Sequence, residues 1–254
     1  MKLKLIALAA VLAAAGSANA APLSTGSDGN GGLFFNIWDA AGSYSRNIGY
    51  TIDSFEAGLA AAGAFNLNLA ADATLTTFMS TVDTATLQWN VSANDNAGAR
   101  RLLETFATLP ATTLKADSVR SMTGGTLNFV NNLNSKLVSS DSATYIPADA
   151  GYAGNPGNNV SGVLNFSNAG SFATNSAANG LSFMRINAAA TGLAFSTYTP
   201  YVDGTDAVKV YLDGSNALHI AAVTAVPEPE TYAMLLAGLG LMGAIARRRN
   251  KKSA

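Results

Sequence analysis

An apolar segment stands close to each end of this 254-residue chain, and the two segments limit the globular part to the residues between them. The first segment, Leu5–Ala15, follows two lysines and precedes a small-x-small site formed by Ala18 and Ala20. A basic start, a short apolar run and such a site, in this order, are typical of a secretory signal peptide. We expect residues 1–20 to be removed and the mature chain to begin at Ala21.

A membrane-spanning N-terminal helix is the alternative interpretation of this segment. An uninterrupted run from Leu5 to Ala15 is too short for it, because a helix needs about 20 apolar residues to cross a bilayer. The predicted partners of this end are therefore the Sec translocon and signal peptidase.

The second apolar segment is a predicted hydrophobic helix over residues 231–246, in which Tyr232–Ala246 carry no charge. As a helix this uncharged stretch would measure roughly 22 Å, which is shorter than the hydrocarbon core of about 30 Å. It is followed by a basic cluster, which the positive-inside rule keeps in the cytoplasm, so that the body lies on the opposite side of the membrane. The cluster consists of Arg247, Arg248, Arg249, Lys251 and Lys252.

A proline–glutamate motif, Pro227-Glu228-Pro229, precedes this helix. Each proline lacks an N–H group and favours extended geometry before it, so we expect an exposed segment that an enzyme can reach. A plain membrane anchor would account for the helix and the arginines but not for this motif.

These three parts, in this order at the extreme C-terminus, resemble the PEP-CTERM sorting signal. The resemblance covers a motif at residues 226–230, the helix at 231–246 and the basic cluster at 247–252. It implies processing by an exosortase in a Gram-negative bacterium that makes exopolysaccharide. It also implies that Pro227, Glu228 and Pro229 are recognition residues for the sorting enzyme rather than a catalytic site.

The body between the two ends, residues 21–225, is poor in charge and mildly acidic. Eight of the fifteen basic residues and fourteen of the sixteen acids fall in it, giving a net charge of about −6. Because phosphate binding needs clustered Lys and Arg, a nucleic-acid partner is disfavoured. The absence of cysteine excludes thiol catalysis and thiolate metal sites.

Period-two alternation predicts several strands in the body. The hairpin is the clearest, since Val208–Leu212 and Leu218–Ile220 flank the turn residues Asp213–Asn216. The segment 99–107 is ambiguous between helix and strand, and we favour the strand. The other predicted strands cover residues 33–39, 47–52, 87–91, 181–187 and 193–202, and residues 141–180 are expected to form loops or weak edge strands.

Helical periodicity appears at three places. Leu75–Val82 has Asp72 as a candidate N-cap, and Leu127–Leu137 predicts a second helix whose start is limited by Gly124 and Gly125. Residues 55–63 predict one or two helical turns. The predicted class is therefore α+β with β dominant, a sandwich-like exported domain with inserted helices, between the signal peptide and the single C-terminal hydrophobic helix.

Candidate catalytic residues are few. His219 is the only histidine, so a Ser-His-Asp triad would have to use it, yet the hairpin places it on the strand face shared with Lys209 and Tyr211. A hydrolase would need paired carboxylates, and Glu56 and Glu104 are the only glutamates of the body. We predict that no residue of the body is catalytic.

Ligand sites are equally weakly marked. Aspartates in the turn sequences SDGNGG, VDGTD and LDGSN are expected to cap their own turns, and calcium binding there is the alternative. Sugar stacking would need exposed aromatic rings. The candidates are Trp38, Trp89, Tyr198 and Tyr201, of which we expect the two tryptophans to be core residues. No cofactor or metal is predicted.

The sequence therefore predicts an exported, non-enzymatic surface or extracellular-matrix protein linked to exopolysaccharide and biofilm. Before processing, it would be an inner-membrane intermediate with its body on the periplasmic side. Afterwards it would reach the cell surface or the matrix, with exopolysaccharide as a candidate partner. A carbohydrate-binding module is the alternative, and a secreted hydrolase is the lesser alternative.

Overall fold

The computed structural model describes residues 22–61, 65–98, 100–108, 113–155, 170–171, 180–223 and 242. The predicted signal-peptide site, the sorting motif and the basic cluster lie outside these residues, as does the predicted hydrophobic helix apart from Met242. None of the helices among the described residues is both long and apolar enough to cross a membrane.

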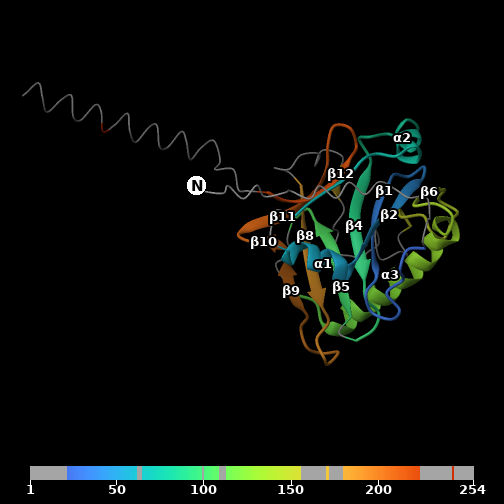
Figure 1. Ribbon diagram of the computed structural model, residues 1–254. Helices are drawn as coiled ribbons and strands as arrows, with labels where there is room; N and C mark the ends of the chain where they lie inside the picture. Colours follow the sequence, from blue (N-terminus) through green and yellow to red (C-terminus); the bar gives the residue numbers. More distant parts are fainter. Residues whose placement is uncertain are drawn as a thin grey trace, which may run out of the picture.

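One antiparallel twelve-stranded sheet organises the described residues (Figure 1). Its main path runs in the order β3-β12-β11-β8-β5-β4-β1-β2-β6, while β7, β9 and β10 pair with β4, β8 and β11. The strands are β1 (Gly32–Trp38), β2 (Ser43–Thr51), β3 (Asn66–Leu69), β4 (Gln88–Asn94), β5 (Arg101–Phe106), β6 (Ser142–Tyr145), β7 (Gly170–Ser171), β8 (Leu181–Asn187), β9 (Thr197–Pro200), β10 (Val202–Asp203), β11 (Asp206–Leu212) and β12 (Leu218–Val223).

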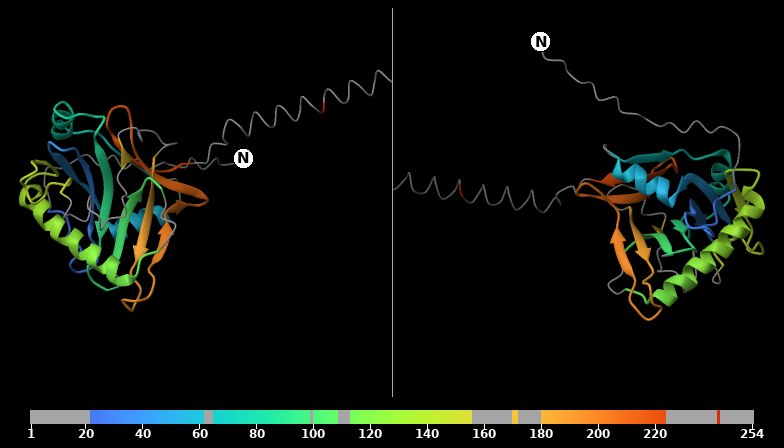
Figure 2. Two further views of the ribbon diagram at one scale, coloured as in Figure 1. Left: turned by 180° about the vertical axis from the view of Figure 1, so that it is seen from behind. Right: turned by 60° about the horizontal axis from the view of Figure 1, so that its bottom comes forward.

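The predicted sandwich is wrong, because the strands form a single sheet that curls into half of a barrel (Figures 1 and 2). Right-handed twist accumulates over many neighbouring strands, and a long sheet relieves it by curling. The curl brings the inner side chains of distant strands together, for example Phe35 and Trp89 with Leu212 and Ile220 in one core cluster. A second sheet is therefore not needed to bury the inner face. The predicted β-dominant character is confirmed.

Two short helices accompany the inner core of the curled sheet. Helix α1 (Ile52–Ala60) follows β2 directly and buries Ile52 and Phe55. Helix α2 (Ala73–Met79) buries Leu75 and Phe78, and the Asp72 carboxylate accepts a hydrogen bond of 2.7 Å from the Leu75 N–H, which confirms the predicted N-cap.

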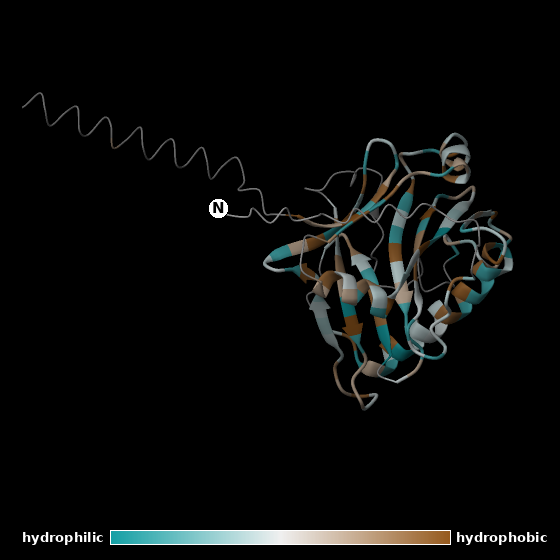
Figure 3. Ribbon diagram, in the orientation of Figure 1, coloured by the Kyte–Doolittle hydropathy of each residue, from teal (hydrophilic) through white to brown (hydrophobic). Residues whose placement is uncertain are grey.

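The outer face of the sheet is covered by the long helix α3 (Ala116–Leu137), which lies on the opposite side from α1 (Figure 2). Strand alternation explains how both faces are buried: Phe35 and Ile37 of β1 join the inner core, while Phe34 and Trp38 pack with Phe129 of α3. Figure 3 shows this alternation as changes of hydropathy along the strands.

Most locally encoded elements match the sequence. The β11–β12 hairpin pairs Tyr211 with His219 around the expected turn, and the ambiguous segment 99–107 contains strand β5. Of the weakly marked segment 141–180, β6 is the last strand of the sheet path. Residues 193–196 are not a strand, since β9 begins only at Thr197.

The start of α3 was predicted incorrectly. The helix begins at Ala116, and Gly124 lies in its interior rather than limiting its start. The propensity cost of a helical glycine is about 1 kcal/mol. Burial of Val119 and Met122 against Leu102, Phe106 and Ile186 offsets that cost.

Candidate functional site

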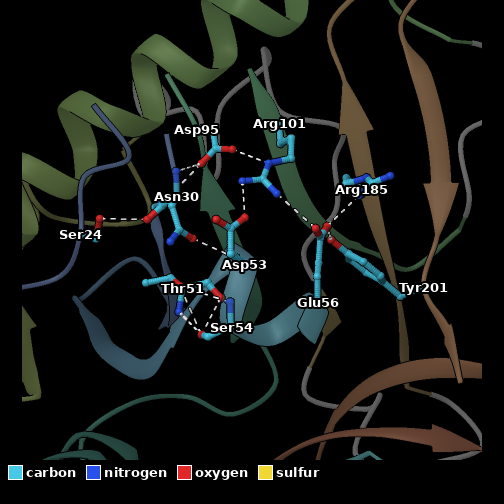
Figure 4. Close-up of polar contacts among 11 residues, drawn as sticks. Ser24, Asn30, Thr51, Asp53, Ser54, Glu56, Asp95, Arg101, Arg185 and Tyr201 are labelled. Carbon is cyan, nitrogen blue, oxygen red and sulfur yellow. Dashed lines mark hydrogen bonds and ion pairs between the residues drawn. The ribbon is translucent and has the colours of Figure 1, made fainter. Parts of the chain in front are cut away.

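A network of ion pairs ties α1 to the inner face of the sheet (Figure 4). Arg101, at the start of β5, is its centre. Its Nη2 lies 2.7 Å from Asp53 Oδ1, its Nη1 lies 3.1 Å from Glu56 Oε2, and its Nε donates to Asp95. Burial acts to lower the pKa of Arg101, but the hydrogen bonds to Asp95 and Asp53 outweigh it and raise that pKa.

Glu56 connects this arginine to β8 and to the residue that follows β9. Glu56 Oε1 accepts a hydrogen bond of 3.0 Å from Arg185 Nη1 and one of 2.7 Å from the Tyr201 hydroxyl. Burial, followed by the hydrogen bond to Glu56, raises the pKa of Tyr201 well above its ordinary value. The Glu56 carboxylate is therefore held by two guanidinium groups and one phenol.

Asp95 extends the network to the N-terminal loop. Its Oδ1 accepts hydrogen bonds from the N–H groups of Asn30 and Gly31, the latter at 3.1 Å. The Asn30 side chain in turn accepts a hydrogen bond of 2.9 Å from the Asp53 N–H. Asn30 adopts a φ of 105°, a conformation in which asparagine is enriched. Asp95 thus fastens the start of the body to the end of β4.

Local sequence places α1 so that its two acids reach the arginines. Thr51 and Ser54 form a reciprocal capping box, with the Ser54 hydroxyl 2.8 Å from the Thr51 N–H. Phe55 points into the core beside Phe183 and Tyr201, at ring distances of 5.3 and 5.1 Å. With Phe55 buried, Asp53 and Glu56 lie three residues apart on a common helix face, above Arg101.

These ion pairs hold α1 against the sheet, and we call the cluster the ion-pair clamp; its charged members are Asp53, Glu56, Asp95, Arg101 and Arg185. Three carboxylates face two guanidinium groups, so the cluster carries one net negative charge, and every carboxylate accepts at least one charged hydrogen bond. Asp95 is only 5% exposed in its side chain whereas Asp53 is 59% exposed, which places the strongest pairing at the buried end.

Glu56 and Glu104, the sequence candidates for a carboxylate pair, are not brought together. Glu56 binds Arg101 and Arg185 on the inner face of the sheet. Glu104 lies on β5 three residues after Arg101, and alternation directs it to the α3 side, where it accepts 2.7 Å from the Ser92 hydroxyl. The sheet itself separates the two carboxylates.

A buried polar row on this outer face was missed by the sequence reasoning. Asn36 donates to Asn90 at 3.0 Å and accepts from Ser45 at 2.7 Å, and all three side chains are fully buried. Alternating patterns reveal that polar residues share a face, but they do not reveal that a helix covers it. The only available signal was that asparagine and serine recur at the positions of β1, β2 and β4 that point to this face.

His219 is half-buried on β12, on the face that it shares with Tyr211, as expected from the hairpin. Its ring stacks on Tyr211 at 4.8 Å, and its Nε2 lies 2.9 Å from Asp213 Oδ2. Ser215 donates its hydroxyl to Asp213 Oδ1 at 2.6 Å, so the aspartate lies between serine and histidine. A catalytic triad has the histidine in the middle, so these residues lack that order.

Asp213, in the turn sequence LDGSN, caps its own turn as expected. Asp213 accepts from the N–H groups of Ser215 and Ala217 at 2.8 and 3.0 Å. The hydrogen bonds from Ser215 and then His219 lower the pKa of Asp213 well below its ordinary value. Among the described residues, no group of three or more His, Cys, Asp or Glu is arranged to hold a metal ion.

The aromatic candidates lie mostly inside the protein. Trp38 and Trp89 are buried, which confirms their expected place in the core. Tyr201 is 8% exposed and donates a hydrogen bond to Glu56. The Tyr198 hydroxyl accepts a hydrogen bond of 2.9 Å from the Leu114 N–H. These four rings therefore do not form an exposed row.

The remaining sequence candidates fall outside the described residues: the cleavage-site residues Ala18, Ala20 and Ala21, the motif Pro227-Glu228-Pro229 and the basic cluster 247–252. Strand β12 ends at Val223, so only residues 224–226 separate the sheet from Pro227.

Comparison with protein families identifies the C-terminal segment. Residues 225–250 match the PEP-CTERM protein-sorting motif. The chain therefore carries the sorting motif of exported, membrane- or surface-associated proteins that are processed by an exosortase. The match spans the tail and leaves the body unassigned. No curated protein and no solved structure matches the chain significantly.

Proposed function

We propose that this protein is a non-enzymatic surface or extracellular-matrix component with a structural or adhesive role linked to exopolysaccharide. Its N-terminal signal delivers it through the Sec translocon, signal peptidase cuts after Ala20, and the C-terminal helix holds it as an inner-membrane intermediate with the body in the periplasm. An exosortase then cleaves near Pro227–Pro229 and releases the body to the surface or the matrix. The observation that carries the proposal is the sorting motif at residues 225–250.

The arrangement of charges in the body is consistent with a structural role. The ion-pair clamp is centred on Arg101. Its hydrogen bonds join α1, β5, β8 and the residue after β4 to one another within the fold. A cluster whose charged groups are bound to one another suits a structural component rather than one that turns over a substrate.

The test is the intact mass of the mature protein from its native host. Wild type is expected to begin at Ala21 and to end between residues 227 and 231. A variant with Pro227, Glu228 and Pro229 replaced by alanine should keep residues 247–252 and stay in the membrane fraction. Thr224→Ala, a change just before the motif, serves as the matched control and should be processed like wild type.

Two other results would contradict the proposal. If both wild type and the triple-alanine variant retain Arg247–Lys252, the tail is only an anchor and the link to exopolysaccharide loses its support. If wild type is processed but remains in the periplasm, the sorting step stands and the surface or matrix role fails.

A further inference from the structure

A groove between α2 and the ends of β1, β2 and β6 is independent of the sorting tail. Its volume is about 520 Å³, which falls within the range of about 300–1,000 Å³ that is usual for small-molecule sites. In Figure 1, α2 stands beside the ends of β2 and β6. The lining residues are Ala41, Gly42, Ala73, Thr74, Thr77, Phe78, Thr81, Val82, Thr144, Tyr145 and Ile146.

The floor of this α2–β6 groove is apolar and firmly held. Phe78 belongs to the inner core and is 7% exposed. The Tyr145 ring packs on the α3 side, where its hydroxyl donates a 2.6 Å hydrogen bond to the Leu133 carbonyl, so its backbone rather than its ring borders the groove. Gly42 packs closely here, because a Cβ at this position would lie 3.0 Å from the Tyr145 carbonyl oxygen. Ile146, which is 61% exposed, adds an apolar side chain at the rim.

Hydroxyl groups surround that apolar floor. Thr74, Thr77 and Thr81 follow one another along one side of α2 and the turn after it, and Thr144 belongs to β6. Thr77 and Thr81 donate to the Ala73 and Phe78 carbonyls at 2.9 and 2.8 Å and keep their acceptor capacity. The hydroxyls of Thr74 and Thr144 make no hydrogen bond within the described residues, so each can still donate and accept.

The charge around the groove indicates a neutral ligand. None of the described lining residues is charged. Two flanking acids are paired, since Lys136 lies 2.7 Å from Asp149 and Arg46 lies 3.7 Å from Asp72. Asp83, which follows Val82, accepts a hydrogen bond from the Ala85 N–H in its own turn. An ionised ligand would lose hydration here without gaining a counter-charge, which is costly.

We infer that the α2–β6 groove binds a neutral saccharide. A pyranose ring has an apolar C–H face and a rim of hydroxyl groups. The apolar face complements Phe78, Val82 and Ile146, and the hydroxyls complement the threonines. The inference goes beyond the proposed function, since it assigns a ligand class and a site to the body.

The experiment uses the full chain, purified in a detergent without a sugar headgroup, and saturation-transfer difference NMR as the measurement. The probes are the neutral disaccharides maltose, cellobiose and lactose, with glucuronic acid as the charged comparison. We expect at least one neutral disaccharide to bind and glucuronic acid to bind more weakly. The exposed Thr77→Trp change fills the groove and should abolish binding.

A conservative double variant separates loss of hydroxyls from loss of shape. Thr74→Val with Thr144→Val keeps the side-chain volume and should weaken binding about tenfold, the effect of losing one or two net hydrogen bonds. Thr76→Val, on the same helix but outside the lining residues, is the matched control and should bind like wild type. Circular dichroism checks that each variant is folded.

Three results would overturn the inference: no neutral disaccharide binding to wild type at millimolar concentration, binding that persists unchanged in both groove variants, or glucuronic acid binding as tightly as the neutral sugars. If Thr77→Trp does not fold, the double valine variant decides alone. Correct tail processing without sugar binding would refute this inference and leave the proposed sorting unaffected.

Discussion

The Ser92 hydroxyl donates a 2.7 Å hydrogen bond to Glu104 Oε1, and both side chains are fully buried on the α3 side of the sheet. Burial raises the pKa of Glu104 well above its ordinary value, while the bond from Ser92 acts in the opposite direction. A carboxyl group in such a site favours its protonated form, so it makes the stability of the fold depend on pH.

Glu104→Gln should therefore remove a pH-dependent loss of stability. Because the folded-state pKa is raised, the unfolded chain loses its proton first as pH rises above about 4.3, and wild type then loses up to roughly 1.4 kcal/mol per pH unit until the raised pKa is reached. Urea unfolding between pH 4 and 8 measures this. Glutamine cannot ionise, so the variant should have a flatter curve. Ser92→Ala should raise the folded-state pKa of Glu104 further and so extend the loss of stability to higher pH. Parallel curves for wild type and Glu104→Gln would contradict the assignment.

The ion-pair clamp predicts unequal effects for the two aspartates on Arg101. Asp95→Asn alters a 5% exposed side chain that also accepts from two backbone N–H groups, so it should lower the free energy of unfolding by about 3 kcal/mol. Asp53→Asn alters a 59% exposed partner and should cost less than about 1 kcal/mol. Chemical denaturation of the two variants checks the order, and equal losses would mean that the clamp is not graded by burial.

Gly124→Ala should stabilise the protein. A Cβ at Gly124 would meet nothing within 4 Å, and alanine in a helix interior is favoured over glycine by about 0.5–1 kcal/mol. Gly31→Ala is the opposite case, because its Cβ would lie 2.0 Å from the Asn94 carbonyl oxygen. The thermal midpoint should rise for the first variant and fall for the second. A fall for both would show that α3 tolerates no added methyl group.

Asp213→Asn should loosen the β11–β12 hairpin in a pH-dependent way. The folded-state pKa of Asp213 is lowered, so its ionised form stabilises the hairpin above the ordinary value of about 3.9, and this contribution disappears as pH falls towards the lowered pKa. Amide exchange near Tyr211 should be faster in the variant at pH 6, and the difference should shrink as the pH is lowered below 4. The exposed Asp28→Asn is the control, and a matching increase there would contradict the prediction.

Short-range features were predictable from the sequence because the residues that encode them are neighbours. The turn at Asp213–Asn216 and the cap at Asp72 each depend on hydrogen bonds within four residues. The single curled sheet was not predictable in this way, since β3 pairs with β12 about 150 residues later in the chain. Such pairings depend on the whole fold rather than on local alternation.

The clamp was hidden for the same reason. Its members, Asp53, Glu56, Asp95, Arg101, Arg185 and Tyr201, are scattered over almost 150 residues and form no motif. The usable signal was the charge balance of the body. Acids outnumber bases there, so each arginine can find an acidic partner. The outer polar row was also hidden, since its Asn and Ser residues are typical of exposed strands.

The position of β12 has a consequence for the order of events during export. This strand is the last one that the structure describes, yet it lies between β3 and β11 instead of at an edge. The sheet is incomplete until β12 has crossed the membrane, and the tail starts only a few residues after Val223. A membrane-held tail would keep the newly exported chain in place while its final strand is inserted, so that cleavage would release a finished fold.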